Sequence, residues 1–536
     1  MKRAAWVPLA LVAVLTTAHA KKSPAAPEAP PPEGVRVERL GGGTRLEAVL
    51  PGWLRGYALP RRADGSRDVV LLVGASWPTS SLRRGEARPA GAPCDGPDAV
   101  DAARTAPCRL LRLDPSGSGA IEVLRDDLPA NAWSLDAFDV DDDGTEELLL
   151  FLDGEIRVLR EADGKRFAGG PELLVADSAL GRGERHPRIV RSPAVARTIL
   201  PLATAGGLRA YGRLADGSFG LVSDAPLPLS ARIEYGSLRI RTAEVTELGA
   251  VPSGAPLLAT AGDGEDEVRA DRLRSLLLDP LAPAARRSVA CWSRLPAREW
   301  LHDRAYLTLD GRPAMIVTTT PADKLKIFGE KSLRLFLLEE DRTKAGKPPL
   351  LAAETGASIW QAVEPSLLDA NGDGRTDLVI AYWKGMGKDA VALDAYLRKE
   401  DGSFDPSPRG TTIDAEDGNR TFVDYGRDLD GDGKADLSLI AGGKVLVFPG
   451  AKSSPTGKDL VASAPRHALP LPSWASSDRR IVASLGSGGV SMWSEHGRIG
   501  LPRPVDLDGD GRSEILLDAV LQDGRSAFVI FLPTAP

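Results

Sequence analysis

Residues 428–437 read Asp428-Leu429-Asp430-Gly431-Asp432-Gly433-Lys434-Ala435-Asp436-Leu437, and this pattern is the strongest signal in the chain. Three other segments share it: DVDDDGTEEL from Asp139, DANGDGRTDL from Asp369 and DLDGDGRSEI from Asp506. Each has Asp at position 1, Asp or Asn at 3, Asp at 5, Gly at 6, an acid at 9 and an aliphatic residue at 10. A motif that recurs at intervals of tens of residues indicates a repeat architecture.

The spacing of the acids predicts a calcium loop. Ca²⁺ takes about six to eight oxygen ligands, and a tight turn supplies them from side chains at positions 1, 3 and 5, a backbone carbonyl at 7 and a later carboxylate. Glycine at position 6 permits the sharp turn, because it has no side chain to clash. The predicted side-chain ligands are Asp139, Asp141, Asp143 and Glu147; Asp369, Asn371, Asp373 and Asp377; Asp428, Asp430, Asp432 and Asp436; and Asp506, Asp508, Asp510 and Glu514.

The turns have two other possible interpretations, an EF-hand and a simple Asx turn. In an EF-hand the closing Glu stands at position 12, but position 12 is Leu150, Ile380, Leu439 or Leu517 here. The loops could also be Asx turns whose acids are merely solvated. Because three acids pointed into one turn repel each other without a cation, calcium is favoured over the simple turn. We expect about four structural Ca²⁺ sites, none of them catalytic.

The segments that follow the loops predict strands. ELLLFLDGEIRVLR after the first loop and DLSLIAGGKVLVFPG after the third are short aliphatic runs broken by Asp-Gly or Gly-Gly, a pattern typical of strand, hairpin and strand. The loops are therefore expected to join β-strands, and the fold class is predicted to be all-β. Degenerate loops at Gly65, Gly254 and Gly311 keep the glycine and the strand and are expected to hold no metal.

The repeats predict a β-propeller of four-stranded blades. The loop glycines, with one vanished loop expected near Ala196, give about eight units of roughly 60 residues, the length that a blade needs. The segments near 35–50 precede the first loop, and only two strands follow the last one, so strands from both termini are expected to close the ring. An open solenoid is the alternative.

The four loops and their following strands resemble the FG-GAP and VCBS repeats. That resemblance implies a calcium-binding β-propeller like the head of integrin α-chains, usually with seven blades rather than the eight counted above. It also implies that position 7 contributes only its backbone carbonyl, at Thr145, Arg375, Lys434 and Arg512.

The N-terminal region predicts export. Residues 1–20 combine a charged start, a short apolar run and an Ala-His-Ala cleavage site, which is typical of a signal peptide. Residues 21–34 form a Pro-rich linker, and the propeller is expected over 35–536 with a polar surface insertion at 83–109. The protein is therefore expected to be secreted, periplasmic or in the cell envelope. In such an oxidising compartment a Cys94–Cys108 bridge is favoured, with Cys291 as a buried thiol.

Composition and the lack of common catalytic motifs disfavour several classes of function. The chain has 536 residues and a formal net charge of −7, which disfavours nucleic acid as a partner, and no apolar run is long enough to span a membrane. Common catalytic motifs for serine hydrolases, zinc proteases and nucleotide binding are missing from the sequence. The sequence favours a binding or scaffold module for a protein or glycan ligand over an enzyme. A polysaccharide lyase or hydrolase and a calcium-dependent lectin remain open, the lectin because tryptophans could stack on sugars.

Overall fold

The computed structural model describes residues 33–74, 106–177, 199–321 and 332–533. Within these ranges it leaves out 41–42, 115–119, 142, 163–164, 205–206, 227–229, 235–236, 242–244, 251–255, 262–272, 280–285, 297–298, 342, 344–345, 359–362, 385–389, 415–421, 452–458, 473–481, 487–488, 495–496, 500–502 and 522–524. The predicted signal peptide, most of the linker and the insertion, Cys94 and the expected loop near Ala196 lie outside the described residues.

The described residues form strands and turns without a helix, which confirms the predicted all-β class. Among them are six four-stranded antiparallel sheets in which the strands follow sequence order. The strands of these sheets are β3 (Trp53–Ala58), β4 (Val69–Gly74), β5 (Cys108–Leu113) and β6 (Ile121–Leu128); β7 (Ser134–Phe138), β8 (Glu147–Leu152), β9 (Glu155–Leu159) and β10 (Glu172–Ala176); β16 (Val245–Ala250), β17 (Pro256–Ala261), β18 (Arg274–Asp279) and β19 (Arg286–Cys291); β20 (Glu299–Leu309), β21 (Arg312–Pro321), β22 (Ser332–Glu339) and β23 (Leu351–Ser358); β24 (Glu364–Leu368), β25 (Asp377–Lys384), β26 (Ala390–Tyr396) and β27 (Arg409–Asp414); β28 (Phe422–Arg427), β29 (Asp436–Ala441), β30 (Lys444–Phe448) and β31 (His467–Pro470).

Three further sheets contain the remaining described strands. One has three strands, one has two, and one has eight and joins the two ends of the described chain. Their strands are β11 (Ile199–Thr204), β12 (Gly207–Arg213) and β13 (Phe219–Pro226); β14 (Ser230–Glu234) and β15 (Ser237–Arg241); and β1 (Gly34–Leu40), β2 (Gly43–Val49), β32 (Val482–Gly486), β33 (Gly489–Ser494), β34 (Gly497–Ile499), β35 (Arg503–Val505), β36 (Glu514–Leu521) and β37 (Ser526–Pro533).

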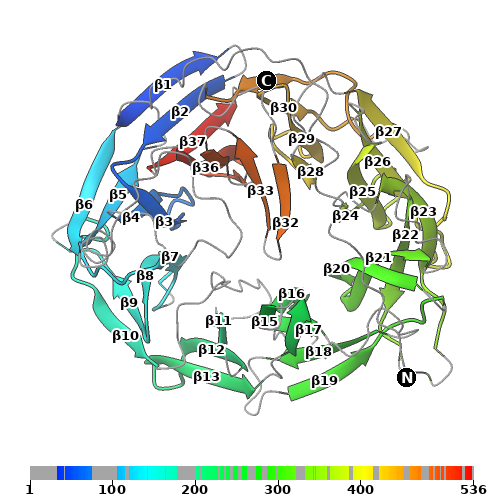
Figure 1. Cartoon of the computed structure of the whole chain (residues 1–536), viewed down its shortest axis with the longest axis horizontal. Helices are drawn as coiled ribbons and strands as arrows, with labels where there is room; N and C mark the ends of the chain where they lie inside the picture. The colour runs from blue at the N-terminus through cyan, green and yellow to red at the C-terminus, as the bar shows by residue number, and fades with distance from the viewer. Residues whose placement is uncertain are drawn as a thin grey trace.

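Figure 1 shows the sheets arranged around a common centre, with strands such as β3, β7 and β24 on the inside and β6, β10 and β27 on the rim. This arrangement of four-stranded antiparallel sheets is consistent with propeller blades. In the eight-stranded sheet β2 pairs antiparallel with β37, from Gly43 opposite Pro533 to Val49 opposite Ala527. Strands from both ends of the described chain thus share one sheet, as expected.

The apolar core lies between neighbouring sheets. Strands β4, β8 and β29 are buried along their whole length, because each has a neighbouring sheet on both faces. This explains why their sequences are rich in consecutive aliphatic residues, as in VVLLVG of β4, and do not alternate strictly between apolar and polar residues. One cluster joins the β3–β6 sheet to the β7–β10 sheet, and another joins β24–β27 to β28–β31.

The cysteine prediction was wrong at Cys108. This residue begins β5, its thiol is free, and its side chain is fully buried in the cluster between the first two four-stranded sheets. A side chain that points into this core faces away from a surface loop. Burial also raises the pKa of the Cys108 thiol. Cys291 is half-buried, not buried, at the end of β19, and its thiol is also free.

Three of the tryptophans lie in the core and not on an open surface. Trp53 and Trp292 are buried, and Trp133 packs against Phe151 with ring centroids 5.7 Å apart, so these three tryptophans serve packing and not a sugar surface. None of the described segments is a helix of the length and apolarity that crossing a membrane requires.

Candidate metal centre

All four motif loops occupy one topological position. Each loop connects two consecutive strands that pair antiparallel: β7 and β8, β24 and β25, β28 and β29, and β35 and β36. The prediction that they join β-strands is therefore confirmed. The glycine at position 6 has a positive φ in every loop, between +80° and +87°, a conformation that L side chains rarely adopt.

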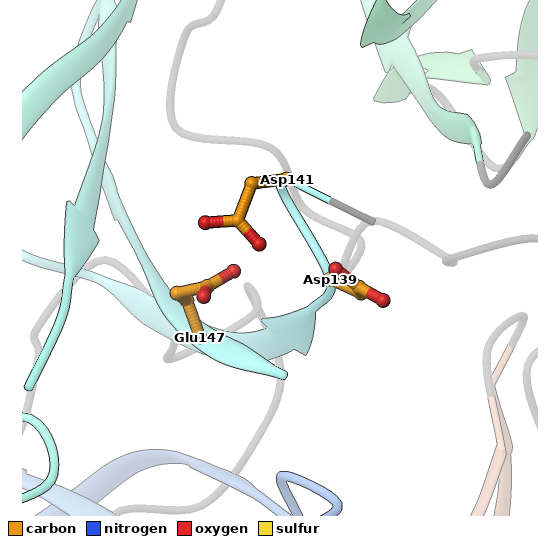
Figure 2. Close-up of side chains that lie close together, drawn as sticks. All are labelled: Asp139, Asp141 and Glu147. Atoms are coloured by element: carbon orange, nitrogen blue, oxygen red, sulfur yellow. The ribbon is translucent and has the colours of Figure 1, made fainter. Parts of the chain in front are cut away.

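Three of the loops bring carboxylates together. One oxygen from each of three acids lies within 4.8 Å of the others in the groups Asp139, Asp141 and Glu147; Asp428, Asp430 and Asp436; and Asp506, Asp508 and Glu514. Figure 2 shows the first group, in which the carboxylates of Asp141 and Glu147 face each other and Asp139 lies beside them on the loop. The acids are those predicted at positions 1, 3 and 9.

The loop from Asp369 to Asp377 does not form such a group of three acids. Its position 3 is Asn371, whose Nδ2 donates to Asp373 Oδ2 at 2.9 Å. An amide oxygen is still a possible calcium ligand, but it carries no charge. This loop therefore presents a less negative set of oxygens than the other three.

The position-5 acids stand outside the three clusters. In each loop the position-5 carboxylate accepts the backbone N–H of position 7, for example Lys434 N to Asp432 Oδ1 at 3.0 Å. Three of these acids also pair with the basic side chain at position 7: Asp373 with Arg375 at 2.5 Å, Asp432 with Lys434 at 2.5 Å, and Asp510 with Arg512. Position 7 is predicted to contribute its backbone carbonyl, and in these three loops its side chain also neutralises the acid at position 5.

The position-9 acid holds each loop closed. One of its oxygens accepts the backbone N–H of position 2 in all four loops: Val140 to Glu147 at 2.8 Å, Ala370 to Asp377 at 3.0 Å, Leu429 to Asp436 at 2.7 Å and Leu507 to Glu514 at 2.6 Å. In two loops the second oxygen accepts another N–H, from Arg398 to Asp377 and from Gly450 to Asp436. The closing acid thus has a structural role in addition to any role as a ligand.

Burial raises the pKa of these closing acids. Loss of solvent raises the pKa of Glu514 to about 7, that of Glu147 to about 6 and that of Asp436 to about 6. The same cause raises the pKa of Asp377. Removing a carboxylate from water disfavours its charged form, and the nearby acids of the same loop add to the effect.

We predict that the metal-free protein becomes less stable as the pH rises from 5 to 8. A carboxyl whose folded pKa lies above its unfolded value stabilises the fold below the unfolded pKa, and this contribution is lost as the pH passes the folded pKa. For Glu514 the window runs from about 4.5 to about 7. Unfolding midpoints in a chelator at several pH values measure the effect, and the Glu514→Gln variant should show a flatter profile. A midpoint that rises over this range in both proteins would contradict the prediction.

Basic residues that the sequence analysis missed lie against the acids. Arg160 Nη1 contacts Asp141 Oδ2 at 2.8 Å and Glu147 Oε1 at 3.6 Å, and Arg466 pairs with Asp430. Arg160, Arg213 and Arg398 share the pattern R-x-x-D-G before a hairpin tip. Arg213 donates to the Asp141 carbonyl and Arg398 to Asp310, so each reaches a loop of the preceding sheet. The recurring R-x-x-D-G was the signal that could have identified Arg160, Arg213 and Arg398.

No protein-family profile and no curated protein matches the chain. Solved structures similar to it include a candidate 6-phosphogluconolactonase from Bacteroides uniformis, with 15% identity, a TM-score of 0.32, and coverage of 76% of this chain and 98% of that one. The WD40 domain of SCAP from fission yeast has 11% identity and a TM-score of 0.36, covering 79% of this chain and 92% of that one. The strand order of this chain defines its fold independently of these structures.

Proposed function

We propose that this protein is an exported calcium-binding β-propeller that acts as a binding or scaffold module outside the cytoplasm. The observation that carries the proposal is the recurrence of one acid cluster on equivalent loops of three sheets. Calcium has a structural role here: it ties the first strand of a sheet to the second. The partner is a protein or glycan, and no nucleic acid is expected.

The donor set fits a hard divalent cation. Every grouped ligand is a carboxylate, and oxygen donors suit Ca²⁺ and not zinc or copper. In the first cluster Asp141 Oδ1 is buried and accepts no hydrogen bond. A buried carboxylate oxygen without a donor is costly, and a cation bound among Asp139, Asp141 and Glu147 would satisfy it.

The fold supports eight blade units in the proposed propeller. We count the six four-stranded sheets, the β11–β13 sheet and the strands β35, β36, β37, β2 and β1 of the eight-stranded sheet as units, and assign no unit to the β14–β15 sheet or to β32–β34. The resulting eight equals the repeat count and differs from the seven blades usual for FG-GAP and VCBS proteins. We propose that pairing of β2 with β37 closes the ring. Closure would leave no open sheet edge between the first and last units.

Metal counting tests this function directly. Equilibrium dialysis of the full chain against Ca²⁺, followed by elemental analysis, is expected to give three to four ions per chain, the fourth from the loop that contains Asn371. The matched variants Asp428→Asn and Asp506→Asn should each remove one ion. A wild-type chain that retains no calcium above background would overturn the proposal.

Export has its own test. Expressed from the whole sequence in a bacterial host, the protein is expected in the envelope or medium fraction with Lys21 as its first residue. A variant with Leu11→Arg and Val14→Arg in the apolar run should stay in the cytoplasm with an uncleaved start. Wild-type protein found uncleaved in the cytoplasm would contradict export without affecting the calcium result.

A further inference from the structure

The loop formed by residues 59–68 has the shape of the motif loops but lacks the acids at positions 1 and 3. It joins β3 to β4, and Gly65 has φ +89°, within a few degrees of the motif glycines. Ser66 N donates to Asp64 Oδ1 at 2.9 Å, the same contact that position 7 makes to position 5 in the motif loops. Aligned on Gly65, position 5 is Asp64, position 9 is Asp68 and position 3 is Arg62.

In this loop Arg62 replaces the acid at position 3, and its guanidinium neutralises Asp68 at position 9. Arg62 Nη2 donates to Asp68 Oδ1 at 2.5 Å, and Arg62 Nε donates to Asp68 Oδ2 at 3.3 Å. In three of the motif loops an acid stands at position 3, so positions 3 and 9 carry like charges there and repel each other without a cation. Here the guanidinium supplies the positive charge from within the loop.

A second arginine reaches the same acid from the next sheet. Arg166, which lies between β9 and β10, donates from Nη1 to Asp68 Oδ2 at 2.5 Å and from Nη2 to the carbonyls of Arg61 and Glu146. Asp68 is only 2% exposed. Its two oxygens are therefore held by charged donors from two different sheets.

Glu146, in the motif loop between β7 and β8, forms hydrogen bonds to loop 59–68. Its Oε2 accepts Arg61 N at 2.9 Å, and its own backbone N–H donates to the Arg61 carbonyl at 3.2 Å. On the other side Arg67 N donates to the Leu507 carbonyl at 2.7 Å, inside the last motif loop. Loop 59–68 thus contacts the motif loops that precede it and follow it around the ring.

We propose that Arg62 and Arg166 take, in loop 59–68, the place of the divalent cation, so that this loop locks the β3–β6 sheet to the β7–β10 sheet without a metal. The comparison with calcium rests on the function proposed above, whereas the ion-pair lock does not. The lock holds the strands that follow β1 and β2 in register with the next sheet even when calcium is absent.

The test compares Asp68→Asn with Asp64→Asn in the full chain, each in a chelator and in saturating Ca²⁺. Breaking a buried ion pair leaves uncompensated charge, so Asp68→Asn should lower the unfolding midpoint by about 5 °C or more, equally in both buffers. Asp64 is exposed in the same turn, and its variant should stay within about 1 °C of the wild type.

If Asp68→Asn does not fold, Arg62→Met supplies the measurement, because the Arg62 side chain is 44% exposed and its loss is tolerable. It should lower the midpoint by about 2–4 °C in both buffers. Loss of stability seen only in Ca²⁺ would mean that the loop binds metal, and Asp68→Asn or Arg62→Met variants no different from Asp64→Asn would mean that there is no lock; either result overturns the proposal. Failure of the calcium sites would appear separately, as a wild-type midpoint that does not respond to Ca²⁺.

Discussion

Thermal unfolding of the chain in saturating Ca²⁺ is expected at a midpoint about 10 °C above that in a chelator. A ligand that binds only the folded state stabilises it by about 2.7 kcal/mol at a concentration one hundred times its Kd, so three acid clusters together contribute about 8 kcal/mol. The midpoint should rise progressively as Ca²⁺ passes its Kd, which for extracellular modules is about 10⁻⁴ to 10⁻³ M.

Magnesium provides the control for this titration. Mg²⁺ demands a smaller octahedral site and gives up its water reluctantly, so the same concentration should raise the midpoint much less. Equal shifts with both ions would indicate general charge screening of the acids. A midpoint unchanged by either ion would mean that the acidic turns are only turns, and the calcium module would lose its main support.

The second large effect on the unfolding midpoint is expected for Asp436→Ala. Unlike Asp432→Ala, this variant should lose stability in the chelator as well as in Ca²⁺. Asp436 is 1% exposed and accepts backbone N–H groups from Leu429 at 2.7 Å and Gly450 at 2.6 Å. Asp436→Ala leaves two N–H groups unsatisfied, at a cost of about 1–3 kcal/mol each, and removes a ligand. Its midpoint should fall in chelator and fall further in Ca²⁺.

Asp432→Ala is the matched comparison within the same loop. Asp432 is exposed, and its partner Lys434 belongs to a surface pair that contributes little to stability. This variant should unfold like the wild type in chelator and lose stability only in Ca²⁺. The pair of variants thus separates the structural role of position 9 from ligation at position 5. Equal losses in both buffers for Asp432→Ala would contradict its assignment as a ligand.

Much of the candidate site could be predicted because its chemistry is local. Positions 1, 3 and 9 of one loop are close in sequence, and the glycine at position 6 forces the turn, so the three acid clusters follow from the ten-residue pattern. Position 5 was only partly foreseen. Its carboxylate turns toward the basic side chain at position 7 in the loops of Arg375, Lys434 and Arg512, a local contact that the ligand pattern obscured.

The cysteine prediction failed for a different reason. Spacing of Cys94 and Cys108 within a polar segment favoured a surface bridge, but Cys108 is the first residue of β5, and the alternation of that strand turns its side chain into the core. A one-residue difference in strand phase moves a side chain from one face to the other. The sequence around the insertion does not define that phase.

The amino-acid pattern by itself determined the all-β class, the strands after each loop, the turn glycines and the acids at positions 1, 3 and 9, because hydrophobic runs and turn chemistry act over a few residues. Tertiary structure decided which basic side chains neutralise the acids of these turns and of loop 59–68. Arg166 meets Asp68 across 98 residues and Arg466 meets Asp430 across 36. Such pairs form only when neighbouring sheets or hairpins are packed side by side, since the reach of a guanidinium is short and the burial that strengthens the pair exists only in the folded protein.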